Sequence, residues 1–241
     1  MSRFITLIKG EFLRLQRYKL FAASIFVSIM WVGVLHFVDM VNVTGLIPQL
    51  VFLDVTTMAV LLVGVSFIYE RDEATLYSML ISPITKSQYI WAKLLSHITP
   101  SIISLSIMFI YAKTFKTLDI NYFLLLGGVL LVAFFHSQIG FLLTFHTRDF
   151  TGLVMLIITF FLISILPVIL DEFAIVTNEV FRKLIFLLPT KSALMIIMGT
   201  TGSIESWKII VSIVYMVLGS VFLYYLIWKK LQDHFLKGGG K

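Results

Sequence analysis

Six long apolar stretches constrain this chain more than any other feature. They cover approximately residues 20–38, 49–69, 94–112, 122–145, 151–170 and 208–228. A helix needs about 20 mostly apolar residues to cross the hydrocarbon core of a bilayer, so each stretch is long enough to span a membrane. Hydrophobic residues make up 59% of the 241 residues, above the roughly 45–50% of soluble domains. We therefore predict an all-α integral membrane protein with six transmembrane helices, forming a single domain over residues 1–241.

The connection between the last two spans, residues 171–207, predicts an outer loop with structure of its own. Within it, residues 181–199 are largely apolar but contain three basic side chains and, near the middle, Pro189. Charges and an interior proline are costly in a helix that faces lipid. We therefore predict two short helices that dip into the membrane or lie on it, rather than a seventh span.

The distribution of lysine and arginine predicts the orientation of the six spans. If the N-terminus is inside, the cytoplasmic segments hold thirteen of these residues and the outer segments hold six. Because cytoplasmic loops carry the excess of basic residues, both termini are predicted to lie in the cytoplasm, with the chain in the plasma membrane. Attraction to anionic membrane lipid accounts for the net charge of +6, and no nucleic-acid partner is needed to explain it.

Residues 1–19 have the pattern of an amphipathic helix at the membrane interface. At 100° per residue, one side gathers apolar residues and the opposite side gathers basic ones. The apolar side holds Phe4, Ile5, Ile8, Phe12 and Leu15, and the basic side holds Arg3, Arg14 and Arg17. Such a helix would lie with its basic side toward headgroups and water. A helix that simply extends the first span into the cytoplasm is the alternative.

Residues 70–93, here called the 70–93 segment, form the predicted first cytoplasmic loop. Carboxylates at Glu70, Asp72 and Glu73 precede apolar residues at helical spacing, Leu76 and Leu80. The following Ser82-Pro83 pair predicts that one helix stops and another starts, since serine caps helices and proline suits a first turn. Lys93 is expected to snorkel toward the interface. These residues alone fit a docking surface for another protein and a solvated charge run equally well.

The 70–93 segment resembles the corresponding segment in membrane subunits of ABC-2 type exporters. The residues that carry the resemblance are Glu70, Glu73, Thr75, Leu76, Leu80, Ser82, Pro83 and Lys93. Ala74 departs from the pattern, because glycine is common at that position. The resemblance implies a coupling helix that docks into a groove of a separate ATP-hydrolysing subunit, with Arg71 and Asp72 in the same contact surface and the carboxylates paired with basic groups of the groove.

A transport role follows from the resemblance. It implies an exporter in which this chain, paired with a second copy or a homologous membrane subunit, works with ABC ATPase subunits. The sequence has no Walker A loop, so ATP and magnesium are expected to bind the ATPase subunit, and no cofactor is expected in this chain. No catalytic or metal-binding constellation is recognisable either. Two alternatives stay open: an integral membrane enzyme acting on lipid, and a non-transporting membrane anchor for a cytoplasmic protein.

Polar residues inside the spans are candidates for a substrate pathway, because ionisable groups are costly at membrane depth. Asp54 lies near the outer end of the second span, where it either meets a cationic group or is hydrated. His136 and Gln138 lie near the middle of the fourth span. They either line a pathway or hydrogen-bond neighbouring helices.

Overall fold

The six predicted spans are confirmed as helices. The computed structural model describes residues 3–73, 75, 83–176 and 178–238, with side chains as far as residue 231. Six of the helices in these ranges are long and apolar enough to cross a membrane. They are α2 (Leu20–Phe37), α3 (Leu46–Asp72), α5 (Lys86–Phe115), α6 (Tyr122–Thr144), the Phe150–Glu172 span and α11 (Ser206–Gly238). The Phe150–Glu172 span consists of α7 (Phe150–Phe160), a π-helical turn (Phe161–Ile165) and α8 (Leu166–Glu172).

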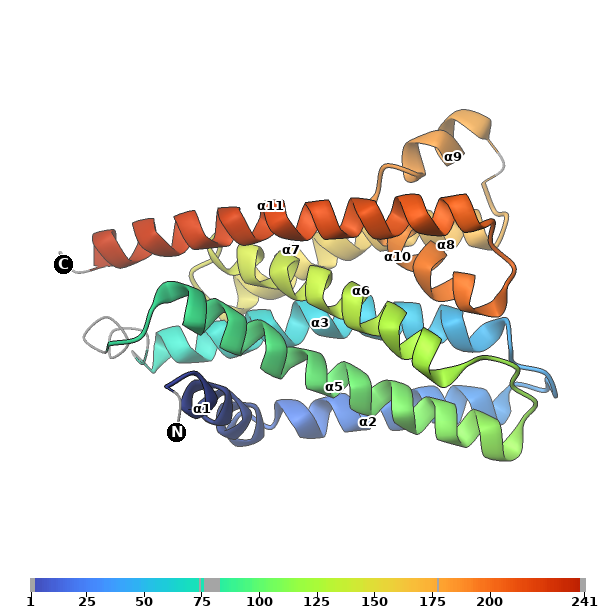
Figure 1. Cartoon of the computed structure of the whole chain (residues 1–241), viewed down its shortest axis with the longest axis horizontal. Helices are drawn as coiled ribbons and strands as arrows, with labels where there is room; N and C mark the ends of the chain where they lie inside the picture. The colour runs from blue at the N-terminus through green and yellow to red at the C-terminus, as the bar shows by residue number, and fades with distance from the viewer. Residues whose placement is uncertain (1–2, 74, 76–82, 177, 239–241) are drawn as a thin grey trace.

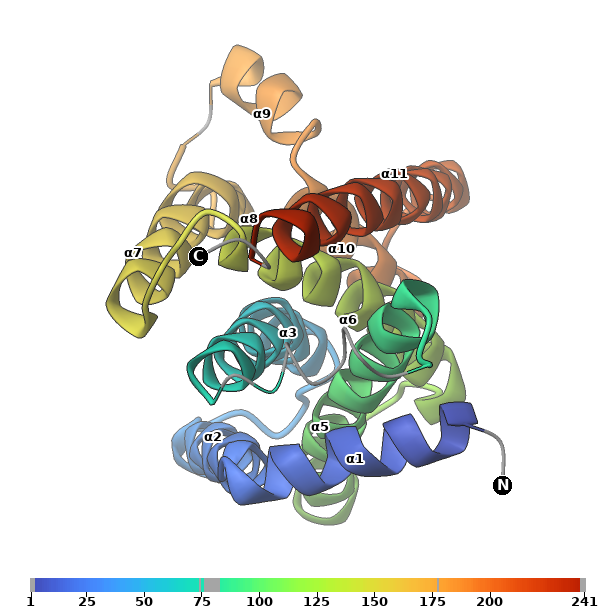
Figure 2. The ribbon, with the colours of Figure 1, turned by 90° about the vertical axis from the view of Figure 1, so that its left-hand side faces the viewer.

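Helix α3 is the centre of the bundle. Seen from one end, it is surrounded by α2, α5, α6 and α7 (Figure 2). Of its most apolar 18-residue window, 78% is buried, against 17% for α11 and 22% for α2. Helix α3 leads directly into the 70–93 segment. A displacement of that segment therefore acts on the helix that packs against α2, α5, α6 and α7.

Helices α3 and α6 touch through their backbones at Gly140. A Cβ atom placed on Gly140 would lie 2.3 Å from the carbonyl oxygen of Val60 and 2.8 Å from its Cα. Small residues at membrane helix interfaces allow this close approach, and any larger side chain would force the helices apart. The glycine therefore fixes the separation of the two helices.

Helix α5 begins eight residues earlier than the predicted span. Thr85 is its N-cap: the threonine hydroxyl oxygen accepts a hydrogen bond from the Gln88 backbone amide, and the Thr85 backbone amide donates to the Gln88 side-chain oxygen. This capping box satisfies two amides that a helix start leaves free. The prediction that Ser82-Pro83 starts the helix is corrected, because Pro83 lies in a bend ahead of the cap.

The N-terminal residues form a separate helix, α1 (Arg3–Arg17), that crosses the end of the bundle in front of α5 in the view of Figure 2. Lys19 has a left-handed backbone conformation, with φ of 61°. Because this conformation interrupts a right-handed helix, α1 does not continue α2 in a straight line. The alternative of a simple extension of the first span is therefore wrong.

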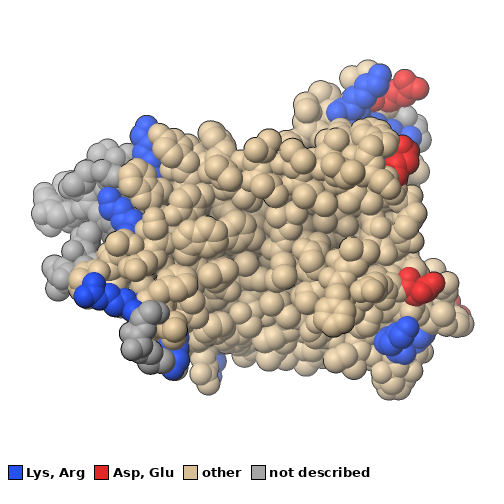
Figure 3. Space-filling view, viewed as in Figure 1, with Lys and Arg blue, Asp and Glu red and all other residues tan. Residues whose placement is uncertain are grey.

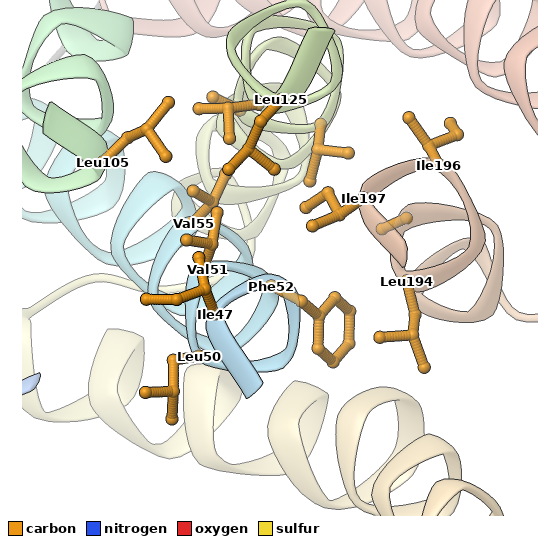
Figure 4. Packing of buried hydrophobic residues seen from close by; sticks show 14 of the residues in the cluster. Ile47, Leu50, Val51, Phe52, Val55, Leu105, Leu125, Leu194, Ile196 and Ile197 are labelled. Atoms are coloured by element: carbon orange, nitrogen blue, oxygen red, sulfur yellow. The ribbon is translucent and has the colours of Figure 1, made fainter. Parts of the chain in front are cut away.

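The outer loop contains the two predicted short helices, α9 (Glu179–Ile185) and α10 (Pro189–Met198). The angle between α9 and the Pro189–Thr201 stretch is 87°, so the two short helices form a sharply bent pair. Helix α10 turns back into the bundle, where Leu194 faces Phe52 of α3 (Figure 4). The apolar face of α10 is thus buried in protein, while α9 projects from the bundle (Figure 1).

The two ends of the bundle differ in charge. Helix α1 and the C-terminal end of α11 lie at the same end (Figure 1), here called the basic end. The face shown in Figure 3 carries lysine and arginine at the basic end, a charge-free band in the middle, and both signs of charge at the opposite end. This band is the surface expected to contact lipid tails.

Candidate functional site

Both ends of the 70–93 segment meet in a buried cluster of charges at the basic end. The cluster is defined by Glu11 and Arg14 of α1, Glu70 at the end of α3, and Lys93 in the first turns of α5. Glu70 and Lys93 are fully buried, Glu11 is 1% exposed, and only Arg14 keeps appreciable exposure, 26% of its side chain. Three helices that are distant in sequence therefore share one ionic site.

Lys93 is the hub of the cluster. Its Nζ donates to Glu70 Oε1, and lies 3.1 Å from Glu11 Oε2 and 3.2 Å from the Ser66 hydroxyl. The hydroxyl of Tyr89 donates to the other Glu70 oxygen at 2.8 Å. Lys93 and Glu70 therefore use most of their hydrogen-bonding capacity inside this chain, as buried charges require.

Arg14 closes the cluster on its more exposed side. Its Nη1 lies 2.5 Å from Glu11 Oε1 and 3.5 Å from Glu70 Oε1. Burial lowers the pKa of the Arg14 guanidinium, but the charges of Glu70 and Glu11 outweigh that effect and raise it above its usual value. Two carboxylates and two cations therefore balance, which avoids the large cost of an unpaired buried charge.

A second, more exposed contact fastens α1 to the end of α3. Arg17 Nη2 lies 3.3 Å from Glu73 Oε1, and the Tyr18 hydroxyl donates to Glu73 Oε2 at 2.9 Å. Partial burial and the bond to Glu73 raise the pKa of the Tyr18 hydroxyl above its usual range, so Tyr18 remains a donor at physiological pH. Exposed ion pairs of this kind contribute little stability, so the buried cluster is the stronger attachment.

Three expectations from the sequence are corrected here. Glu70 does not face outward, because Lys93 and Tyr89 hold it inside the chain. Lys93 does not snorkel, because both carboxylates lie within reach of its buried amine. Arg14 turns toward Glu11 rather than toward headgroups. A charged side chain pairs internally when a neighbouring helix supplies the opposite charge, and sequence periodicity does not show that neighbour.

The other predicted contact residues of the 70–93 segment that the structure describes divide into two groups, bonded and exposed. Arg71 donates to the Thr147 carbonyl at 2.8 Å, and Thr75 donates to the Glu70 carbonyl at 2.9 Å. Asp72, in contrast, is exposed, and so is Pro83. The predicted contacts of Leu76, Leu80 and Ser82 lie outside the described residues.

The candidate pathway residue Asp54 is buried, with 2% exposure. Its carboxylate accepts a hydrogen bond from the Trp31 indole at 3.1 Å. The expectation that water hydrates this group is therefore wrong for the single chain. Asp54 lies at the contact of α2 and α3 and is not exposed on the surface of the chain.

His136 and Gln138 are also fully buried. His136 Nδ1 donates to the Val132 carbonyl of its own helix at 2.8 Å, and its ring lies 6.3 Å from that of Phe160. The Gln138 amide has no hydrogen-bond partner among the described residues. Because His136 faces α7 while Asp54 faces α2, the three candidates do not form one site.

Glu11 is the site residue that sequence reasoning missed. Its position, three residues after Ile8 and four before Leu15, places a carboxylate on the apolar stripe of the first helix. An acidic residue on such a stripe signals a buried partner, since burial of an unpaired carboxylate is costly. Lys93, inside an apolar run, is the complementary signal.

Comparison with known families agrees with this architecture. The chain matches the family model described as ABC-2 type transporter over residues 2–167. This range contains α1, the first four spans, most of the fifth span, and the entire ionic cluster. A comparison with curated proteins finds no match. Six spans, a separate N-terminal helix and a family match over more than half of the sequence lead to one conclusion: the chain is a multi-pass membrane protein that belongs to the ABC-2 type transporter family.

Proposed function

We propose that this chain is the membrane subunit of an ATP-driven exporter and that the 70–93 segment couples it to separate ATPase subunits. The ATPase subunits bind ATP and magnesium. A second membrane subunit, either another copy or a close relative, completes the substrate pathway. The basic end faces the cytoplasm of a plasma-membrane complex, consistent with the bias of lysine and arginine toward that side.

The buried ionic cluster is the observation that carries this proposal. A loop that transmits force must be fixed at both ends, and here Glu70 precedes the turn while Lys93 follows it. Their pairing with Glu11 adds the interface helix to the same unit. A push on the intervening residues therefore moves α3, α5 and α1 together, rather than bending a flexible linker.

The internal pairing of Glu70 changes the proposed docking surface. Glu70 anchors the segment, and the contact with the ATPase falls to exposed Asp72, partly exposed Glu73, and the predicted apolar residues Leu76 and Leu80. Apolar anchors contribute most to protein interfaces, whereas rim charges contribute little. Leu76 is therefore the first position to test.

The test compares Leu76→Asp with Ile175→Asp in the complex with the ATPase. Both changes introduce one carboxylate in place of an aliphatic side chain, but Ile175 is an exposed residue at the opposite end of the bundle. We expect Leu76→Asp to lower ATPase copurification by about 30-fold or more, the effect of losing a buried anchor of roughly 2 kcal/mol. Ile175→Asp should copurify normally.

Three results would redirect the proposal. Normal copurification and normal ATP hydrolysis with Leu76→Asp would show that the segment is not the docking site. Association of the segment with a partner that hydrolyses no ATP would favour the membrane-anchor alternative. Retention of a lipid-modifying activity by the isolated chain would favour the enzyme alternative.

A further inference from the structure

A groove on the flank of the bundle has the composition of a binding site for a lipid chain. It lies between α5, α6 and α11 and has a volume of about 250 Å³. Its walls include Trp91, Phe134, Val217, Ser220, Val221 and Tyr224. This volume is below the roughly 300–1,000 Å³ of sites that enclose a drug-sized ligand. An unbranched apolar chain suits the groove better than a compact molecule.

Aromatic rings give the groove a preformed shape. The Trp91 ring is stacked 5.4 Å from that of Phe134 and lies 5.8 Å from that of Tyr224. Val221 is 66% exposed and Val217 is 46% exposed, so the groove opens sideways toward lipid. Rigid rings on three different helices lose little conformational entropy when a chain binds between them.

The groove has a basic rim. Lys86 Nζ lies 5.6 Å from the centre of the Trp228 ring, one helical turn beyond Tyr224. The adjacent Ser87 accepts a hydrogen bond from the Tyr224 hydroxyl at 3.0 Å. Among the side chains that the structure describes, which end at residue 231, no carboxylate lies within ion-pair distance of Lys86. A cation above an apolar groove at the interface matches a negative headgroup above an acyl chain.

The buried hydroxyl of Ser220 is a second observation that indicates a ligand in the groove. It is 7% exposed, and its hydroxyl has no hydrogen-bond partner among the described residues. Buried polar atoms without a partner are uncommon in folded proteins. A carbonyl oxygen on a molecule in the groove would supply an acceptor.

We propose that this groove binds an anionic phospholipid from the leaflet at the basic end, with the phosphate at Lys86 and one acyl chain beside Trp91. Lys86 is the first residue of α5 and lies within the 70–93 segment. Occupancy therefore tethers the start of α5 to α11, next to the ionic cluster. The site does not depend on the transport proposal, since it rests on groove shape and rim charge alone.

The experiment measures lipid binding to the full chain, purified with the subunits that accompany it, by native mass spectrometry. The probes are phosphatidylglycerol and phosphatidylcholine with identical acyl chains. We expect the wild type to prefer phosphatidylglycerol. Lys86→Gln should reduce that preference about fivefold, the factor that corresponds to about 1 kcal/mol for one lysine near an anionic surface.

The matched control is Lys208→Gln at the opposite end of the bundle. Lys208 Nζ lies 5.5 Å from the Trp207 ring, much as Lys86 lies over Trp228, but Lys208 already pairs with Glu205 at 2.6 Å. Its replacement should leave the preference unchanged. A preference that falls equally in both lysine variants, or that is absent from the wild type, overturns the proposal.

A second pair of variants tests the groove itself. Val221→Trp adds bulk at an exposed position of the groove wall, whereas Val214→Trp adds it at an exposed position of α11 outside that wall. We expect Val221→Trp to lower binding of both lipids and Val214→Trp to lower neither. Unchanged phosphatidylglycerol binding by Val221→Trp refutes the groove as the site.

Discussion

Replacement of Lys93 by methionine should destabilise the protein more than any single change to an exposed charge. Methionine keeps the length of the apolar stem but removes the cation. The wild-type cluster holds two carboxylates and two cations, and Lys93→Met leaves two carboxylates facing Arg14 alone. Removal of one partner from a buried ion pair costs about 3–5 kcal/mol. Because Arg14 still reaches both carboxylates, we expect the lower end, about 3 kcal/mol.

The double variant Glu70→Gln/Lys93→Met should recover much of this loss. It leaves one carboxylate, Glu11, paired with one cation, Arg14, so the cluster is neutral again. Tyr89 still donates to the glutamine side-chain oxygen. Loss of a balanced pair is far less costly than loss of one partner, because no buried charge is left unpaired.

The assay heats the detergent-solubilised protein to a series of temperatures. The fraction that stays folded is measured at each temperature by size-exclusion chromatography with fluorescence detection. By the scale of soluble domains, about 3 kcal/mol corresponds to a drop of roughly 6–12 °C in apparent Tm. Arg17→Gln, which removes only the exposed contact with Glu73, is the comparison and should change the Tm little. The reasoning is refuted if Lys93→Met unfolds like Arg17→Gln, or if the double variant is no more stable than Lys93→Met.

Two further predictions concern packing and orientation. Gly140→Ala should lower stability by about 1–3 kcal/mol, because the new methyl group meets the α3 backbone. The control is Gly127→Ala in the same helix, which should be tolerated because a methyl group there has open space around it. Equal melting temperatures of the two variants would show that α3 and α6 are not in backbone contact. Single cysteines in this cysteine-free chain should react with membrane-impermeant reagents from outside at position 119 and only after permeabilisation at position 3. The reverse labelling pattern would invert the predicted topology.

Much of the membrane architecture could be predicted because the transfer of each span from water into the membrane depends largely on the residues of that span. A run of about 20 apolar residues identifies a span without knowledge of its neighbours. The same local logic predicted the two short outer helices, since Pro189 and nearby charges exclude a lipid-facing helix. The start of α5 was misplaced because Ser82-Pro83 and Thr85 with Gln88 both have the composition of a helix start. The local sequence does not show which of the two caps the helix.

The sequence by itself therefore determined which six helices are long and apolar enough to cross a membrane, and it carried the family resemblance. Only the tertiary structure decided that Glu70 and Lys93 face each other, that Glu11 joins them, and that Asp54 is bonded to Trp31. The physical reason is that some energies depend on one helix alone, whereas others depend on a pair of helices. Transfer of a helix into lipid is a sum over its own residues, whereas an ion pair or a glycine contact depends on which helix lies opposite. That choice is made only when the helices pack.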